Sequence, residues 1–325
     1  MHYPKAFVAA MASVGYGTRQ QAPIRFSVMH QCTAESSHDE ISSLTIEHLL
    51  QRTQIIRREM YGDSSSPSFI FDHEQLAYPK SSYEMKLKDN EGILLKRRNR
   101  TAVKRGFCNW LIPQRIMIGQ YPGMTPESNG PTSKESEMHI QNMVQDAKIT
   151  QFCCLQTEVP SQDDNVEWEA VGGEVYLDPM SRREFPRPFT RYGAKAQALS
   201  EDSSVEVGFL HSPIEDLGTP SCNDTLLRLL SELLHHLESN ANNALYLHCW
   251  GGRGRAGLIG ACTASLLFPE LTSQEILALV QGGYDTRAGA QAMHRALRRS
   301  PQTEQQREFV QEFVTLVKDA QENIP

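Results

Sequence analysis

The clearest hydrophobic pattern in the chain is a stripe of leucines between residues 223 and 239. The leucines recur every three or four residues, the spacing that places side chains on one face of a helix. They are Leu226, Leu227, Leu230, Leu233, Leu234 and Leu237. Asn223 or Asp224 is a suitable N-cap residue in front of the stripe. The pattern predicts an amphipathic helix over 223–239.

Shorter apolar patterns predict strands and helices on both sides of this helix. Strands are expected at 115–123, 149–156, 205–216 and 244–249, and helices at 42–60, 136–147, 255–267, 273–283 and 303–320. Strands that alternate with helices indicate an α/β layer fold. Residues 157–204 are polar and contain prolines, so we expect an irregular insertion there.

The first third of the chain has a weaker pattern than the rest. Residues 1–45 show no sustained periodicity, and residues 86–105 are rich in Lys and Arg. A solvated linker is the first interpretation of this basic run, and a docking or import patch is the second. We therefore expect a partly disordered N-terminal extension over 1–106 with one helix, followed by a domain over 107–325.

Composition excludes several classes of function. The formal net charge of −7 argues against binding to nucleic acid or to an anionic membrane. No apolar run approaches the roughly 18 residues of a spanning helix. The seven cysteines show neither a CxxC motif nor zinc spacing, which argues against a structural metal and favours a reducing, cytoplasmic location. Residues 1–34 lack Asp and Glu, so an organellar transit peptide is an alternative to a disordered tail.

Residues 244–267 read as an apolar strand, a glycine-rich turn and an apolar helix, and the turn fits two templates. Residues 252–257 match the GxGxxG pattern of dinucleotide-binding folds. That fold needs a second strand, with an acidic residue about 20 positions further on. Here Pro269 and another helical pattern follow, so we reject the dinucleotide template.

The second template is a nucleophilic cysteine followed, six positions later, by an arginine: Cys249 and Arg255. A free cysteine has a pKa of about 8.5 and must become a thiolate to attack. Backbone N–H groups of a loop that opens onto a helix N-terminus favour both a thiolate and a phosphate. Gly251, Gly252 and Gly254 allow the loop to curl in this way. Arg255 is placed to bind two phosphate oxygens.

The stretch "HCWGGRGRAG" resembles the HCxxGxxR signature of the cysteine-dependent tyrosine and dual-specificity protein phosphatases. The resemblance covers residues 107–317 and implies a central mixed sheet flanked by helices. It implies that Cys249 is the nucleophile and that residues 250–254 bind substrate, with neither a metal nor another cofactor. Those substrate-binding residues are Trp250, Gly251, Gly252, Arg253 and Gly254. His248 lies behind the nucleophile, where it is expected to support the loop.

A second stretch, "HSPIEDLGTP", resembles the family's segment that carries the general acid. Asp216 lies 33 positions before Cys249 (249 − 216) and matches the acid's place. Protonation of the leaving oxygen requires such a carboxyl. Glu215 is the neighbouring candidate, and an ordinary loop carboxylate is the alternative interpretation of Asp216.

Two further features concern the breakdown of a phosphocysteine. "QTEQQ" at 302–306 resembles a helix start of some dual-specificity enzymes, which implies that Gln302 or Gln306 helps to position water; a solvated helix start explains them equally well. The family usually has Ser or Thr directly after the arginine, whereas this chain has Ala256. The missing hydroxyl is expected to slow hydrolysis.

The resemblance leaves the substrate open. Phosphotyrosine in proteins, with phosphoserine and phosphothreonine, is the first interpretation. Arg253 favours a phosphoinositide or an inositol phosphate. A set of further arginines is a candidate extension of this basic patch, although a solvated insertion is the preferred interpretation: Arg182, Arg183, Arg187 and Arg191. In a third interpretation, Ala256 marks a pseudophosphatase that only binds phosphorylated partners.

Redox control is a further expectation. A reactive thiolate is readily oxidised. Cys153 or Cys154, on a predicted neighbouring strand, is a candidate for a protecting disulfide with Cys249, although buried apolar cysteines are the simpler interpretation.

Overall fold

The computed structural model describes residues 44–61, 72–85, 103–171, 176–177, 184–185, 187–203, 206–292 and 298–324. The predicted N-terminal tail and most of the basic run at 86–105 lie outside the described residues.

A five-stranded sheet forms the centre of the molecule. Its order is β3 (Cys108–Ile112), β4 (Ile116–Gln120), β9 (Leu245–Cys249), β5 (Gln151–Gln156) and β8 (Gly208–Ile214). Strand β3 is antiparallel to β4, and the other neighbours are parallel. The predicted α/β fold with a central mixed sheet is confirmed.

The middle strand of this sheet, β9, is buried at all five residues. Helices cover both faces of the sheet, so a central parallel strand shows no alternation of apolar and polar residues. The carboxyl end of β9 therefore opens at the middle of one sheet edge, between β4 and β5.

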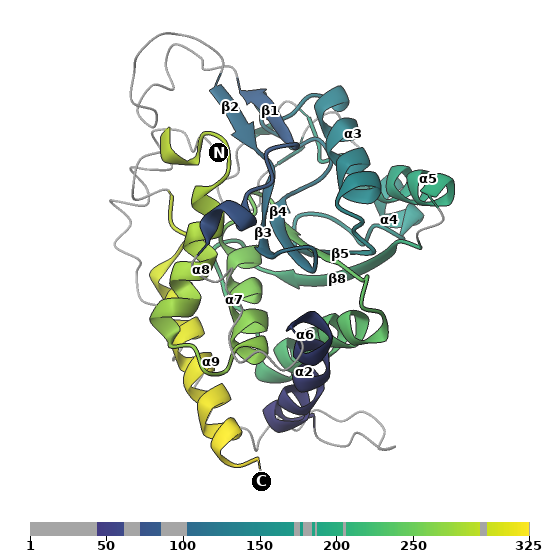
Figure 1. Cartoon of the computed structure of the whole chain (residues 1–325). Coiled ribbons are helices and arrows are strands. Elements are labelled where there is room, and N and C mark those ends of the chain that lie inside the picture. Colours follow the sequence, from purple (N-terminus) through teal and green to yellow (C-terminus); the bar gives the residue numbers. More distant parts are fainter. Residues whose placement is uncertain are drawn as a thin grey trace.

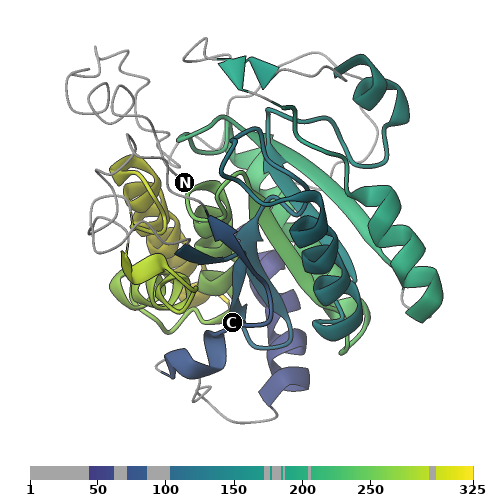
Figure 2. The same cartoon turned by 90° about the horizontal axis from the view of Figure 1, so that it is seen from above.

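Helices cover the two faces unequally (Figures 1 and 2). One face carries α2 (Ile46–Tyr61), α6 (Asn223–Ser239), α7 (Arg255–Leu267), α8 (Ser273–Asp285) and α9 (Glu304–Glu322). The other face carries α3 (Ser133–Gln141) and α5 (Gly193–Ser203). Every residue of α7 is buried, as expected for a helix that is apolar all round and enclosed by other helices.

Helix α2 packs into the same core as the predicted domain, although it lies in the predicted N-terminal extension. Leu49 and Ile56 are buried within this core. Ion pairs tie its outer side to the domain, from Arg52 to Glu238 and from Arg57 to Glu270, each at 3.0 Å.

The predicted irregular insertion at 157–204 is wrong in part. It contains α4 (Asn165–Val171), α5, and the two-residue strands β6 (Tyr176–Leu177) and β7 (Glu184–Phe185). The two helices escaped prediction because their polar sequences carry no clear apolar stripe. A hairpin of β1 (Ser82–Met85) and β2 (Val103–Gly106) was also unpredicted, as were the short 3₁₀ helices η3 (His73–Leu76) and η5 (Ala290–Ala292). The helix predicted at 136–147 corresponds to α3 and the π-helical segment η4 (Asn142–Asp146) that continues it.

Within the part of the chain that the structure describes, no helix combines the length and the hydrophobicity needed to cross a membrane.

Candidate active site

The candidate site lies where β9 ends. Cys249 is the last residue of the strand, residues 250–254 form the loop, and α7 begins at Arg255. Gly254 precedes the helix without a side-chain cap, so the positive end of a 13-residue helix faces the loop. This is the arrangement that an anion and a thiolate both favour.

Gly252 fixes the path of the loop. Its φ of 63° is left-handed, and a Cβ there would lie 2.0 Å from the carbonyl carbon of Gly119 on β4. Only glycine combines this conformation with so close an approach.

An arginine that sequence reasoning missed holds the loop from below. Arg287, almost fully buried, donates to the backbone oxygen of Gly252 at 2.7 Å and to that of Ile118 at 2.9 Å. Its Nε donates to the Asn109 side chain at 2.7 Å. The arginine thereby joins the loop to β3 and β4.

Arg255 is fixed by a second missed residue, Glu158. The two carboxylate oxygens of Glu158 accept hydrogen bonds of 2.7 and 2.9 Å from the guanidinium, and the Ile214 backbone oxygen accepts another at 3.0 Å. The Arg255 side chain is 1% exposed and that of Glu158 is 5% exposed. Burial alone would lower the pKa of Arg255, but the Glu158 carboxylate raises it, so the guanidinium stays charged.

The only sequence signal for Glu158 is its place. It follows strand β5 at the carboxyl edge of the parallel sheet, where functional side chains gather in α/β folds.

Asp216 meets Arg255 across the site. Its Oδ1 lies 3.2 Å from the terminal nitrogen of Arg255. Burial raises the pKa of Asp216, against the lowering effect of the Arg255 charge. A carboxyl with a raised pKa is suited to donate a proton near neutral pH. Glu215, the neighbouring candidate, is exposed.

The backbone after Asp216 is in an unusual conformation. Leu217 has a φ of 64°, a left-handed value that costs a non-glycine residue roughly 1–2 kcal/mol. Such conformations cluster at functional sites, where surrounding contacts enforce them.

Gln302 and Gln306 both approach the loop. A Cβ added to Gly254 would lie 3.3 Å from the Oε1 of each. Gln306 Oε1 accepts from the backbone N–H groups of Gln302 and Thr303, and its Nε2 donates to Gly218 O at 2.9 Å. The amide of Gln306 thus connects the start of α9 to the Asp216 segment.

His248, the residue before the nucleophile, is buried, and its side chain pairs with a residue outside the loop. Its Nε2 lies 2.6 Å from the hydroxyl of Tyr192, while its Nδ1 has no hydrogen-bond partner among the described residues. Burial holds the pKa of His248 well below its ordinary value, so the ring is neutral.

Three other predicted residues surround the loop. Trp250 donates from Nε1 to Glu127 at 2.7 Å and packs edge-on against Phe189. Arg253 is 2% exposed, and its backbone oxygen accepts a 2.9 Å bond from Ser300. Ala256 is fully buried in the first turn of α7.

The arginine patch, the alternative to a solvated insertion, does not form from the two members that the structure describes. Arg187 donates to the backbone oxygens of Thr125, Glu127 and Pro131, and Arg191 donates to that of Gln162. Both arginines hold loops in place instead of facing the site. Arg182 and Arg183 lie outside the described residues.

The two candidate redox cysteines lie on β5, next to β9. Cys154 stands opposite His248 in the register, beside the nucleophile's own neighbour. Burial raises the pKa of Cys154 to about 12 and raises that of Cys153 further. Both are free thiols, and the disulfide with Cys249 stays a prediction.

A family model matches the segment of the chain that contains the loop. Residues 194–310 match the model described as "Swiss Army Knife protein, DSP-PTPase phosphatase domain". The matched segment contains Asp216, Cys249, Arg255, Gln302 and Gln306. No protein of curated function matches the chain.

Solved phosphatase structures overlap with the chain at low similarity. The kinase-associated phosphatase, with serine in place of its catalytic-site cysteine, is 14% identical with a TM-score of 0.37, over 73% of this chain and 94% of that chain. The core catalytic domain of the PP-IP phosphatase SIW14 from S. cerevisiae is 11% identical with a TM-score of 0.36, over 67% and 94%. These low identities and TM-scores carry no argument about the function of this chain.

The segment 194–310, which contains the loop, thus matches a phosphatase domain of the dual-specificity and tyrosine phosphatase class. The predicted resemblance to the cysteine-dependent tyrosine and dual-specificity phosphatases is confirmed over this segment.

Proposed function

We propose that this chain hydrolyses phosphate monoesters in two displacement steps. The Cys249 thiolate attacks phosphorus, the ester P–O bond breaks, and the leaving oxygen takes the proton of Asp216. Water then gives a proton to the Asp216 carboxylate and attacks the phosphocysteine, which releases inorganic phosphate and the thiolate.

The observation that carries this proposal is the position of Arg255 between Glu158 and Asp216. The buried ion pair with Glu158 fixes the guanidinium at the mouth of the helix, and Asp216 lies 3.2 Å away. A phosphate bound to Arg255 is therefore next to the proton donor. Fixed charges of this kind stabilise the charge that develops during phosphoryl transfer.

Among protein substrates, we place phosphotyrosine first. Cys249 is only 3% exposed, so the phosphorus atom must enter the loop to be attacked. The aromatic ring of phosphotyrosine extends further from the backbone than the side chain of phosphoserine or phosphothreonine, which makes these two the poorer protein substrates.

The second substrate candidate is a phosphoinositide or an inositol phosphate. Arg253 lies in the loop itself and adds a second positive charge near the first. A cytoplasmic location fits both candidates and stays a prediction.

Hydrolysis of para-nitrophenyl phosphate by the wild type and by Cys249→Ser tests the reaction. We expect turnover in the wild type and its loss in the variant, with retained binding of phosphate. Equal rates in the two proteins would contradict the proposal, and no turnover in either would favour the pseudophosphatase. A panel of phosphopeptides and phosphoinositides then ranks the substrates.

A further inference from the structure

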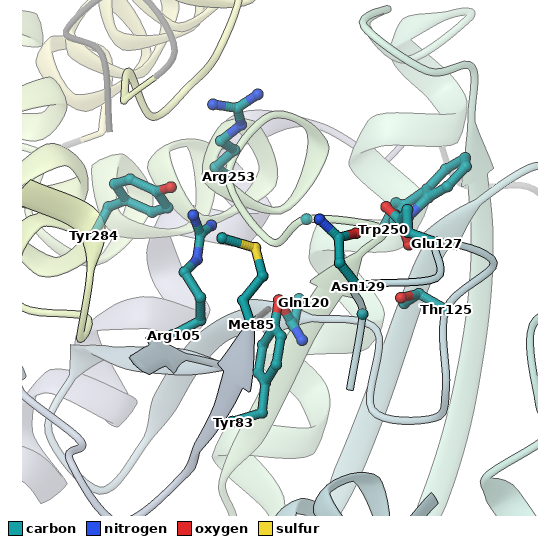
Figure 3. Close-up of a pocket in the computed structure, with 12 residues that line it drawn as sticks. Tyr83, Met85, Arg105, Gln120, Thr125, Glu127, Asn129, Trp250, Arg253 and Tyr284 are labelled. Carbon is teal, nitrogen blue, oxygen red and sulfur yellow. The ribbon is translucent and has the colours of Figure 1, made fainter. Parts of the chain in front are cut away.

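A cavity opens beside the phosphate loop, on the side of the β1–β2 hairpin (Figure 3). Its free space, including the solvent-open mouth, is about 420 Å³. Tyr83, Met85 and Arg105 come from the hairpin, while Trp250, Gly251 and Arg253 come from the loop. The cavity and the loop therefore share a wall.

Two buried polar atoms of the cavity lack protein partners. Gln120 is 8% exposed, and its Nε2 has no hydrogen-bond partner in the described part of the chain; the same is true of Oε2 of Glu127. Buried polar groups are nearly always hydrogen-bonded, because leaving one unpaired is costly. The other oxygen of Glu127 accepts from Trp250, which fixes the carboxylate in place. The cavity thus offers one donor and one acceptor to a ligand.

Positive charge accompanies these groups. Arg105 lies on β2 opposite Tyr83 of β1, and Arg253 lies in the loop two residues before Arg255. Arg253 also acts on the proton donor, since its charge lowers the pKa of Asp216. The arginine that lines the cavity is therefore within electrostatic reach of the reacting centre.

We propose that this cavity binds a second phosphate and a neighbouring hydroxyl of a multiply phosphorylated polyol, while the first phosphate of the same molecule occupies the Cys249 loop. This inference rests on the proposed phosphatase reaction. Arg105 and Arg253 pair with the second phosphate. A hydroxyl both donates and accepts, so hydroxyls of the polyol can donate to Glu127 Oε2 and accept from Gln120 Nε2.

The carboxylate of Glu127 disfavours an acidic side chain as its neighbour, and we therefore favour a polyol over an acidic peptide as the ligand. A second carboxylate or a phosphorylated side chain would pair with the arginines. It would also place another anion next to Glu127 and offer the Glu127 carboxylate no hydrogen-bond donor. Hydroxyls next to a phosphate remove this conflict, and both a free inositol phosphate and a lipid headgroup supply them.

The test compares substrates that differ by one phosphate. We measure kcat/KM for a soluble inositol bisphosphate with neighbouring phosphates, for the matching monophosphate, and for vesicles that carry a bisphosphorylated inositol lipid. A doubly and a singly phosphorylated peptide form the second pair. We expect the wild type to prefer the bisphosphate over the monophosphate, and Arg105→Gln to reduce this preference on the order of tenfold.

Lys104→Gln is the matched control. Lys104 is the exposed neighbour of Arg105 on β2, and side chains alternate between the two faces of a strand, so the preference stays unchanged. Activity on the soluble compound or on the vesicles identifies the source of the ligand. No preference for the bisphosphate, or a preference that Arg105→Gln leaves intact, overturns the inference. A preference for the second phosphate that depends on Arg105 but occurs only with the peptides also overturns the inference.

Binding of the same polyols to Cys249→Ser, measured by calorimetry, needs no turnover. If the polyols bind in a way that depends on Arg105 but the wild type does not hydrolyse them, the proposed reaction is contradicted and the binding role of the cavity is supported. If the wild type hydrolyses para-nitrophenyl phosphate but the bisphosphorylated polyols do not bind selectively, the proposed reaction is supported and the binding role of the cavity is contradicted.

Discussion

At the scale of single residues, the protonation of Asp216 controls the proposed reaction. Its carboxyl must carry a proton when the ester bond breaks, and burial raises its pKa. The protonated form is present below the pKa, so the raised value preserves activity to higher pH. We expect kcat for an alkyl phosphate to fall on the alkaline side, and Asp216→Asn to lower kcat about 100-fold and to remove that fall. The measurement is the pH dependence of kcat.

Glu215→Gln is the control for this experiment, because Glu215 is adjacent and exposed. The wild-type profile should persist in it. An alkaline fall that disappears in Glu215→Gln and persists in Asp216→Asn would assign the acid to Glu215.

Ala256 is the residue at which the chain departs from the family pattern. A hydroxyl there stabilises the departing thiolate, and a hydrogen bond to a charged group contributes about 1.5–3 kcal/mol. We therefore expect hydrolysis of the phosphocysteine to limit turnover of an aryl phosphate, whose leaving group departs easily, and Ala256→Ser to raise kcat for this substrate about tenfold or more. Rapid mixing with para-nitrophenyl phosphate should show a burst in the wild type that shrinks in the variant. A wild type without a burst contradicts the slow step.

At the scale of elements, the loop depends on contacts from strands and helices far away in the sequence. Arg287 alone joins Gly252, Ile118 and Asn109. Arg287→Met leaves these acceptors without their donor, at roughly 1–3 kcal/mol for each buried group. We expect the free energy of unfolding to fall by about 3 kcal/mol and kcat/KM to fall with it. Urea denaturation and steady-state kinetics measure the two effects.

Arg298→Met is the comparison for Arg287→Met. Arg298 pairs with Asp285 at 3.1 Å in a partly exposed position, and such surface pairs contribute at most about 1 kcal/mol. Equal losses in the two variants would show that Arg287 has no special role in supporting the loop.

The elements that the sequence predicted well are those with a strong local pattern. Helix α6 has the bounds expected from its leucine stripe, because spacing alone defines its buried face. Strand β3 escaped prediction because the polar Asn109 interrupts its short apolar run, so the strand shows neither alternation nor a continuous apolar stretch. The loop of Cys249 and Arg255 was recognisable because its residues are contiguous in the sequence.

The supporting residues were not predictable in the same way. Glu158 lies 97 residues before Arg255, and Tyr192 lies 56 before His248. Nothing local distinguishes these side chains from others on polar loops. Their roles arise only when β5 and the segment before α5 pack against β9.

At the scale of the whole molecule, the question is whether helix α2 belongs to the same folding unit as the central sheet and its other helices. Helix α2 contacts α6, α7 and α9, which include the helix that follows the phosphate loop. Its inner face is part of the hydrophobic core. A helix packed in this way unfolds with the domain instead of separately.

Ile56→Ala tests this cooperative unit, since Ile56 is fully buried. Removal of its buried methyl groups should lower the free energy of unfolding by about 2–5 kcal/mol. In urea, the loss of helical circular dichroism and the loss of phosphatase activity should shift together to a lower midpoint. Ile55→Ala is the matched control, because its neighbouring side chain on α2 is 49% exposed and its loss should change stability by about 0.5 kcal/mol at most. Were α2 an independent extension, Ile56→Ala would melt part of the helical signal early and leave the activity midpoint at its wild-type value.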